Sequence, residues 1–354
     1  MDFGICVASK IDEVGLIAHM ENLGYSHAWV ADTQMMWSDC YAVLALAAQQ
    51  TRTIRIGTGV AVAGTRIAPV TANSIATINR LAPGRTFLGL GTGNTAMRVM
   101  GHRPFKIREY EDYIRDVRDL LSGGEAQFTW RDRTRPIRFV MQEHGFLGLE
   151  PPIPIHVSGF GPRSQALAGK YGDGLVISIP RGGTVTRAIA NAQAGAEAAG
   201  RTLDGFYTTA LTNVLLLEPG ESLDAERVVR TIGPAVMASV HYLYDKIAED
   251  GGGDPPPFVR SIWKEFCDLM AEVPEERRHL RVHDSHYVFL HPEEARMVNP
   301  ELIQGCTVAG QPEEIVERIR KLEREGLSQI MFLPRLDLQY RQLEDFTRRV
   351  MERY

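Results

Sequence analysis

The sequence is poor in cysteine, and the few cysteines are widely spaced. Only four occur among 354 residues, and no two of them form a CxxC pair. Disulfide frameworks and zinc ribbons both depend on paired or regularly spaced cysteines. We therefore expect no disulfide scaffold and no zinc site, and we interpret Cys6, Cys40, Cys267 and Cys306 as reduced, buried thiols.

Long apolar runs and a strong charge excess are also missing. No stretch approaches the roughly 20 apolar residues needed to cross a bilayer, and the first residues lack the basic start and apolar run of a secretory signal. The 39 basic and 44 acidic residues give a formal net charge of −5, without the basic excess typical of nucleic-acid binders. No serine lies in a GxSxG elbow, so hydrolase chemistry has no support. We expect a cytoplasmic protein that binds neither membranes nor nucleic acid.

What the sequence does contain is a regular alternation of apolar runs and helical stretches. The apolar runs show little inside–outside alternation, which is typical of strands buried on both faces of a parallel sheet. Strand and helix alternating at this spacing indicate βα units. Eight such runs favour a (β/α)8 TIM barrel over an open doubly wound sheet. The expected strands are residues 3–8, 27–31, 54–62, 86–90, 153–158, 174–179, 207–217 and 329–333.

Two segments interrupt this alternation. An insertion of about 123–150 contains a polar hairpin, and a helical insertion of about 220–310 separates the seventh and eighth strands. The second is far too long for an ordinary loop, and the glycine-proline tract at 251–257 separates two of its helices. We interpret the chain as one domain, 1–354, with the long insertion over the mouth of the barrel. A second small domain is the alternative.

Glycines gather at the carboxyl ends of three expected strands. They lie within residues 57–60, 89–94 and 158–164. Barrel enzymes build their active sites at this face, and glycine permits unusual backbone angles and close approach of a ligand. The segment 91–96 formally matches GxGxxA, but it is not in the first βα unit and no acidic strand end follows about 20 residues later. The glycines therefore predict a ligand site, but not a dinucleotide-binding fold.

The turn after the fifth strand has the composition of an anion site. Pro162 suits the first position of a helix and leaves free N–H groups around it. Ser158, the N–H groups of Gly159 and Gly161, and Arg163 then form a candidate phosphate site. A plain helix start with a surface arginine is the alternative.

Three further side chains are candidate substrate contacts. Trp37 follows two methionines after the second strand, where it either lines an apolar pocket or packs under the loop. Arg66 either meets an anionic group or forms an ordinary ion pair. His286 ends the run His283–His286, which offers a proton donor or substrate contact as well as a purely structural role. No third metal ligand accompanies this run, so we expect no metal site.

Several of these segments, in this order, resemble one known family. The sequence is similar to the bacterial luciferase-like superfamily and most similar to its methylenetetrahydromethanopterin-reductase branch. The resemblance covers most of residues 1–180 and returns weakly at 308–314. It depends on Trp29-Val30-Ala31-Asp32 with Trp37, Ile56–Val60 with Thr65-Arg66 and Pro69, Gly89–Asn94 with Gly101 and Pro104, and Ser158–Gly174.

The resemblance implies a barrel with an insertion that binds either FMN or the deazaflavin coenzyme F420. Members of this branch often carry a cis non-prolyl peptide in the third strand, against which the flavin ring leans, and the matching bond here is Gly59–Val60. The resemblance also implies which residues bind the cofactor. Asp32, Thr58, Thr92 and Asn94 would face the ring or substrate, and Ser158, Gly159, Gly161 and Arg163 would approach the phosphate.

The sequence departs from the family pattern at the usual proton donors. In the sugar-phosphate dehydrogenases of the superfamily, a histidine follows the aspartate and an acid follows the glycine turn; this chain has Thr33 and Asn94. The methanopterin reductases carry an acid in the first strand, where this chain has Cys6. Neither of these two reactions can therefore be assumed. Asp32 and Asn94 are our candidate catalytic residues.

Three hypotheses follow from the resemblance. The first is an F420-dependent oxidoreductase that transfers a hydride between the deazaflavin and a small organic substrate. The second is an FMN-dependent monooxygenase that receives reduced flavin from a separate flavin reductase. The third is a barrel that binds a flavin-like ligand without chemistry. The resemblance also predicts a homodimer.

Overall fold

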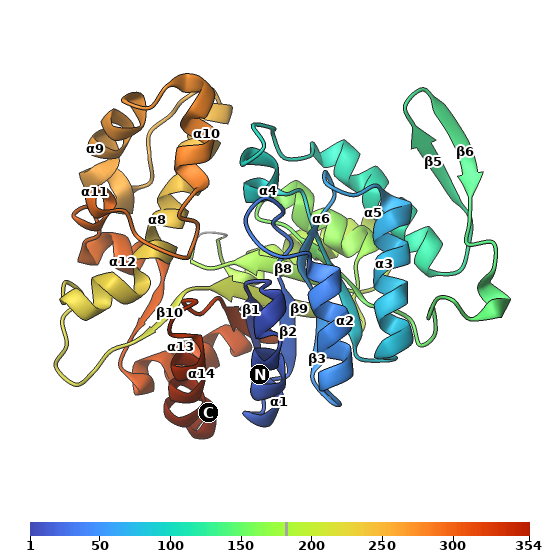
Figure 1. Cartoon of the computed structure of the whole chain (residues 1–354), viewed down its shortest axis with the longest axis horizontal. Helices are drawn as coiled ribbons and strands as arrows, with labels where there is room; N and C mark the ends of the chain where they lie inside the picture. The colour runs from blue at the N-terminus through green and yellow to red at the C-terminus, as the bar shows by residue number, and fades with distance from the viewer. Residues whose placement is uncertain (181–182) are drawn as a thin grey trace.

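Eight parallel strands close into a barrel in a computed structural model, which describes residues 1–180 and 183–354. Their order around the barrel is β1-β12-β9-β8-β7-β4-β3-β2 (Figure 1). The predicted (β/α)8 fold is confirmed. The barrel strands are β1 (Asp2–Val7), β2 (His27–Val30), β3 (Arg55–Val62), β4 (Thr86–Gly91), β7 (Ile155–Ser158), β8 (Gly174–Ser178), β9 (Tyr207–Thr212) and β12 (Gln329–Phe332).

Amphipathic helices surround the barrel. In α5, for example, Tyr110, Ile114, Val117 and Leu121 are buried at the three- and four-residue spacing that places them on one face. Two of the outer helices that the structure describes begin at side-chain caps: the Asp39 carboxylate accepts backbone N–H groups at the start of α2, and the Thr184 hydroxyl accepts one at the start of α7. The outer helices are α1 (Gly15–Asn22), α2 (Cys40–Gln50), α3 (Ala68–Leu81), α5 (Ile107–Leu121), α6 (Pro162–Tyr171), α7 (Val185–Ala198), α13 (Pro312–Arg324) and α14 (Gln339–Arg349).

The seventh expected strand, 207–217, is two strands in the structure. The barrel strand β9 ends at Thr212, and β10 (Val214–Leu216) pairs instead with β11 (Val308–Gly310) in a separate parallel sheet. Asn213 marks the change of direction, because its side-chain amide donates to the carbonyl of Cys306 at 3.2 Å and its own carbonyl accepts from Val308 N at 2.7 Å. The pattern of apolar residues continues through this point and hides the break.

The long insertion leaves the barrel through β10 and returns through β11. Figure 1 shows its helices, in yellow to orange, grouped apart from the outer ring of helices. They pack around a hydrophobic core of their own, separate from that of the barrel, so the single-domain interpretation stays a prediction. The helices are α8 (Glu226–Glu249), α9 (Arg260–Ala271), α10 (Glu275–His283), α11 (Pro292–Ala295) and α12 (Pro300–Cys306).

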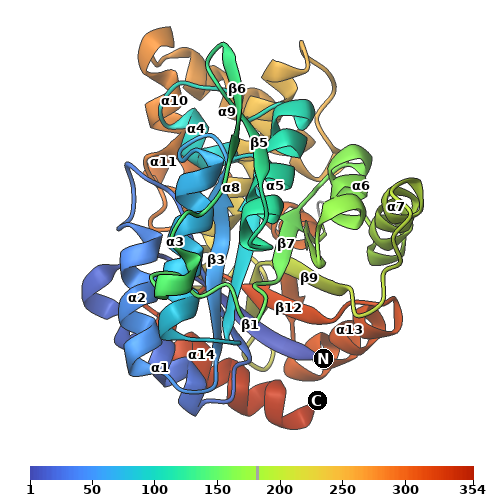
Figure 2. The same cartoon turned by 90° about the vertical axis from the view of Figure 1, so that its right-hand side faces the viewer.

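The shorter insertion contains the predicted hairpin. Strands β5 (Ala126–Trp130) and β6 (Arg133–Ile137) pair antiparallel, and the hairpin projects away from the barrel beside α5 (Figures 1 and 2). Within the described ranges, no helix combines the length and hydropathy needed to span a membrane.

Large side chains fill the barrel interior, and the strand glycines make room for them. Trp29 and Phe87 pack together at 4.3 Å between ring centroids. A Cβ atom at Gly57 would lie 2.4 Å from the Phe87 ring, and one at Gly59 would lie 2.5 Å from Trp29 Cβ. This corrects the expectation that these glycines serve mainly to admit a ligand. Gly93 alone among the glycines of the 57–60 and 89–94 segments has a left-handed φ, at 85°.

Candidate active site

A large cavity lies at the carboxyl ends of the barrel strands, under the insertion. Its volume is about 610 Å³, within the range of small-molecule sites. One wall follows β1, β2 and β12, and the opposite wall comes from α10 and the segment after it. The apolar lining includes Met35, Met36, Trp37, Leu280, Phe289 and Leu336, and the polar lining is Ser9, Lys10, Ser38, Asp284 and His286.

Two of the three predicted substrate contacts line this cavity. The rings of Trp37 and His286 pack against each other in its wall, with centroids 5.8 Å apart. Arg66, the third, lies instead beside the pocket between α5 and the β5–β6 hairpin. The structure therefore brings together Trp37, from the loop after β2, and His286, from the insertion, although they are 249 positions apart in the chain.

The strands on the other side of the mouth carry small and hydroxyl side chains. Ser158 is the register partner of Val176, and Ser178 is the partner of Leu211. Val176 and Leu211 belong to the interior cluster of the barrel, and paired residues point to the same face of a sheet. Both serines therefore point toward the barrel axis near the mouth. The family motifs do not include Ser178. The alternation of side chains along residues 174–179 would have placed it on the same face of the strand as Val176.

Strand β3 is irregular at the position that the resemblance singled out. The Gly59–Val60 peptide is cis, as expected, and the register with β4 shifts between Thr58 and Ala61. The Val60 side chain occupies the space that a Cβ atom at Gly91 would fill, 2.6 Å from its Cγ2. The Cys6 thiol donates to the Gly59 carbonyl at 3.6 Å, and burial raises the pKa of Cys6 to about 12. A neutral thiol thus lies beside the bulge.

Asp32 is engaged in a buried ion pair. Its carboxylate lies 2.6 Å from the Arg66 guanidinium and accepts the Val62 N–H at 3.1 Å. Arg66 also contacts Asp39 at 2.7 Å. Burial disfavours the charge of Arg66, but the hydrogen bond and attraction from Asp32 outweigh it, so the pKa of Arg66 is raised. These contacts favour the ion-pair alternative for Arg66 and a structural role for Asp32 in holding β3 to the loop after β2.

Thr58 does not reach the mouth with its side chain. It pairs in register with Val30 and Leu88, which both belong to the outer core between strands and helices. Its hydroxyl is fully buried and donates to the Gly89 carbonyl at 2.7 Å. The expectation that the Thr58 side chain faces the cofactor is therefore not met, because alternation along β3 turns it outward.

Asn94 begins α4 (Asn94–Arg98), directly after Thr92 and Gly93 at the end of β4. Its side-chain oxygen accepts from Arg98 Nε at 2.9 Å. Since arginine has only donors, this contact fixes the orientation of the Asn94 amide. Thr92 and Asn94 are both half-buried.

Arg98 links this loop to the insertion. It lies 2.7 Å from Glu249 and 3.6 Å from Asp245, both on α8, and it is only 8% exposed. Asp245 in turn contacts His283 of α10 at 3.0 Å. The two histidines of the predicted run 283–286 therefore have different surroundings. His283 pairs with α8 within the insertion, whereas His286 lines the cavity.

The start of α6 offers room for an anion. The predicted residues Ser158, Gly159, Gly161 and Arg163 lie between the end of β7 and the first turn of α6. A Cβ atom added at Gly161 would meet nothing within 4 Å, whereas one at Gly159 would lie 2.8 Å from the Ser164 backbone. Arg163 is exposed. This open space at the N-terminus of a ten-residue helix suits a phosphate group. The buried Ser178 hydroxyl has no hydrogen-bond partner in the described part of the chain. It could form a hydrogen bond with the polar edge of a flavin-like ring. The residues present therefore fit a flavin-like phosphate cofactor.

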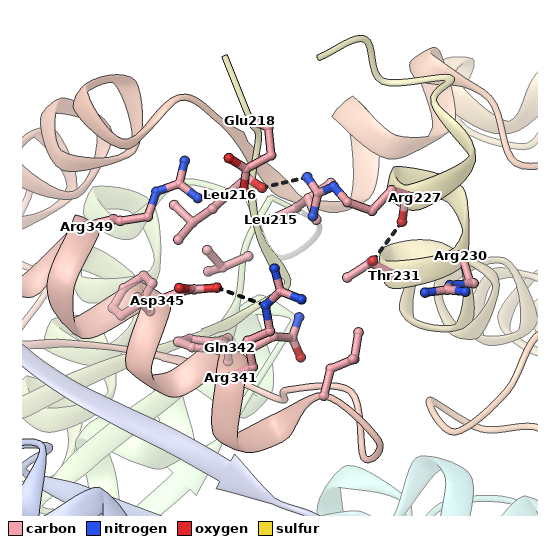
Figure 3. A pocket seen from close by; sticks show the side chains of 14 residues that line it. Leu215, Leu216, Glu218, Arg227, Arg230, Thr231, Arg341, Gln342, Asp345 and Arg349 are labelled. Atoms are coloured by element: carbon pink, nitrogen blue, oxygen red, sulfur yellow. Dashed lines mark hydrogen bonds and ion pairs between the residues drawn. The ribbon is translucent and has the colours of Figure 1, made fainter. Parts of the chain in front are cut away.

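A second pocket lies outside the barrel, between β10, α8 and α14, with a volume of about 170 Å³ (Figure 3). Its rim carries arginines and acids that pair with each other: Arg349 lies 2.9 Å from Glu218, and Arg341 lies 3.6 Å from Asp345. Because the pocket is smaller and away from the mouth, we place the active site in the larger cavity.

The family model of the luciferase-like monooxygenases matches residues 4–329. The chain belongs to this family. The predicted resemblance is confirmed, and the protein is an oxidoreductase enzyme of the luciferase-like family.

Relatives in this family include several reductases and dehydrogenases. A 5,10-methylenetetrahydromethanopterin reductase of Archaeoglobus fulgidus is 26% identical over 320 residues, covering 88% of this chain and 86% of the relative. An F420-dependent hydroxymycolic acid dehydrogenase of Mycobacterium tuberculosis is 34% identical over 203 residues, covering 52% of this chain and 54% of the relative. The coenzyme F420-dependent tetrahydromethanopterin reductase from Methanopyrus kandleri superposes with a TM-score of 0.67 at 20% identity, covering 100% of this chain and 99% of the other, which shows the shared fold.

Proposed function

We propose that the protein is an F420-dependent oxidoreductase that transfers a hydride between the deazaflavin and a small organic substrate. The observation that carries the proposal is that the two sides of the barrel mouth have different linings. The ends of β4, β7 and β8 carry Thr92, Ser158 and Ser178 beside the open turn at Gly161, and a mainly apolar cavity lies between β1, β2 and the insertion. A flat cofactor on the first side and a substrate on the second would be adjacent. The relatives that are named for F420 support the choice of cofactor.

The chain's own residues would hold the two molecules and keep out water. Ser158, Gly159, Gly161 and Arg163 would bind the phosphate of the cofactor, with the helix N-terminus adding partial positive charge. The Gly59–Val60 bulge and Thr92 would support the ring. Bound F420 supplies or accepts the hydride. The Asn94 amide would donate to the ring or substrate, and Asp32, through Arg66, would keep β3 in place.

A fluorescence titration tests the cofactor. Arg163 is exposed and near the open space at Gly161, whereas Arg187 is exposed on the neighbouring helix α7. We expect F420 fluorescence to be quenched on binding, with an affinity that falls about tenfold in Arg163→Ala, as for loss of one hydrogen bond to a charged group. Arg187→Ala is the matched control. Equal loss in both variants would argue against this phosphate site.

The family match itself favours one second candidate, an FMN-dependent monooxygenase with a separate flavin reductase. FMN binding with oxygen-dependent turnover, and no response to F420, would establish it. We also propose that the enzyme is a homodimer, which light scattering of the purified protein tests directly.

A further inference from the structure

The smaller pocket outside the barrel lies where the insertion meets the barrel. Its walls come from β10 and the first turns of α8, at the start of the insertion, and from α14 of the outer ring of helices. Its lining includes Leu215, Phe332 and Phe346, none of which is more than 4% exposed. Its volume of about 170 Å³ equals that of about six water molecules at roughly 30 Å³ each. The pocket therefore suits a small organic molecule rather than a peptide or a nucleotide.

The lining of this pocket carries more positive than negative charge. It contains four arginines and two acids, which Figure 3 shows around the leucines of β10: Arg227, Arg230, Arg341, Arg349, Glu218 and Asp345. Two of the arginines have close acidic partners. Arg349 lies 2.9 Å from Glu218, and Arg227 lies 2.6 Å from Glu221, which is outside the lining. The other two arginines are the ones that a ligand would meet.

Arg230 and Arg341 have no close acidic partner of their own. Arg230 is exposed, and its guanidinium forms no ion pair with another residue that the structure describes. Arg341 lies 3.6 Å from Asp345, which is beyond ordinary hydrogen-bond distance, and Asp345 has a closer partner in Arg348. Exposed ion pairs of this kind contribute little to stability. Both guanidinium groups are therefore available to an anion, and their planar forks match the geometry of a carboxylate.

A neutral donor lies among the same residues. The Gln342 side-chain oxygen accepts the backbone N–H of Arg335 at 2.7 Å. Because this contact assigns the oxygen, the amide nitrogen is the atom that faces a ligand as a donor. It has no hydrogen-bond partner in the described ranges of the chain. Leu216 and Leu338, both half-buried, also line the pocket. The pocket thus combines positive charge and a free amide donor with apolar walls.

We propose that this pocket binds a small organic carboxylate with an apolar body. Arg230, Arg341 and the Gln342 amide would bind the carboxylate, and the hydrocarbon would cover Leu216 and the buried side chains of the lining. An inorganic anion would leave the apolar walls uncovered, and a cation would meet an excess of arginine. Because the ligand contacts both α8 and α14, its binding holds the insertion against the barrel. The site is separate from the proposed cofactor site and does not depend on it.

Isothermal titration of the full chain with hexanoate tests the class of ligand. Hexanoate should bind, and butanoate should bind about 15-fold more weakly, since each buried methylene changes affinity about fourfold. Hexanamide has the same shape without the charge and should bind at least tenfold more weakly than hexanoate. An absence of hexanoate binding, or equal affinity for hexanamide, would overturn the proposal.

Substitutions test whether hexanoate binds in this pocket. Arg341→Gln should lower the affinity about tenfold, as for loss of one hydrogen bond to a charged group, and Arg230→Gln/Arg341→Gln should remove measurable binding. Arg324→Gln is the matched control, because it removes an exposed arginine paired with Glu317 on α13. Equal losses in Arg341→Gln and Arg324→Gln would contradict the assignment. Leu280→Asp alters the large cavity instead and should keep the affinity within about twofold; loss of binding in this variant would place hexanoate there and refute the proposal.

Amide hydrogen exchange tests the link between the insertion and the barrel. Hexanoate should slow exchange at residues 226–231 of α8 and 338–346 of α14, because both segments line the pocket. Exchange in α13, which lies outside the lining, should not change and serves as the control. Hexanoate binding without protection of either segment would refute the proposed site.

Discussion

Removal of the Arg98 guanidinium should destabilise the protein and loosen the insertion. Arg98 is 8% exposed and contacts Asn94, Glu249 and Asp245. In Arg98→Met the apolar stem remains, but two carboxylates of α8 lose their positive partner. Breaking a buried pair in this way costs about 3–5 kcal/mol when the remaining charge is fully buried.

The expected effect is somewhat smaller here, because both carboxylates reach water in part. Their side chains are 22% exposed for Glu249 and 15% for Asp245. We therefore expect the free energy of unfolding to fall by about 2–4 kcal/mol, measured by urea denaturation at pH 7. Neutralising one carboxylate in Arg98→Met/Glu249→Gln should restore about 1 kcal/mol, since less uncompensated charge then stays buried.

The matched control is the same substitution at an exposed ion pair. Arg324 lies 2.8 Å from Glu317 on α13, and both side chains are 63% exposed. Arg324→Met should change the free energy of unfolding by less than about 1 kcal/mol, as surface pairs contribute little. Losses of equal size in the two variants, or no recovery in the double variant, would refute the argument that Arg98 joins α4 to the insertion.

Of three further predictions, two concern the barrel interior and one compares Cys267 on α9 with Cys6 on β1. Burial lowers the pKa of His27 to about 3 and that of His156 to about 4, from 6.5, so below pH 6.5 the unfolded chain takes up protons that the native state does not. Stability should fall by roughly 1.4 kcal/mol per pH unit for each histidine between pH 6 and 4, and His156→Gln should show a shallower slope in urea unfolding; an unchanged slope would count against burial as the cause. Gly59→Ala should lower the unfolding midpoint and abolish cofactor binding, because the added Cβ meets Trp29 at 2.5 Å; wild-type affinity would contradict the packing argument. The half-buried Cys267 should react with a thiol reagent at pH 8 well before Cys6, whose thiol is buried with a raised pKa; equal rates by mass spectrometry would exclude this order.

Local sequence patterns were sufficient to predict the barrel fold. Runs of apolar residues separated by helical stretches identified the eight strands, because a strand buried on both faces needs apolar side chains throughout. Helix caps such as Asp39 and Thr184 are likewise local signals. The short helices of the insertion were mostly missed, since their apolar residues face a separate core and their lengths of four to nine residues carry little periodicity.

The candidate site was only partly accessible from sequence. The segments 57–60, 89–94 and 158–164 were predicted to be carboxyl-terminal turns. The structure places 89–94 and 158–164 at the carboxyl ends of β4 and β7, whereas 57–60 lies inside β3. The direction and the partners of each side chain could not be predicted from the sequence. Thr58 points outward because of its register with Val30 and Leu88, and the pairing of Asp32 with Arg66 depends on a contact across 34 positions.

The sequence by itself determined the class of fold and the family, because these follow from residue order and short-range pattern. Tertiary structure alone decided which side chains meet there. Trp37 and His286 share one cavity, and Arg98 reaches Glu249, only because the insertion folds back over the mouth. Such contacts depend on packing between distant segments, and no local pattern of residues encodes them.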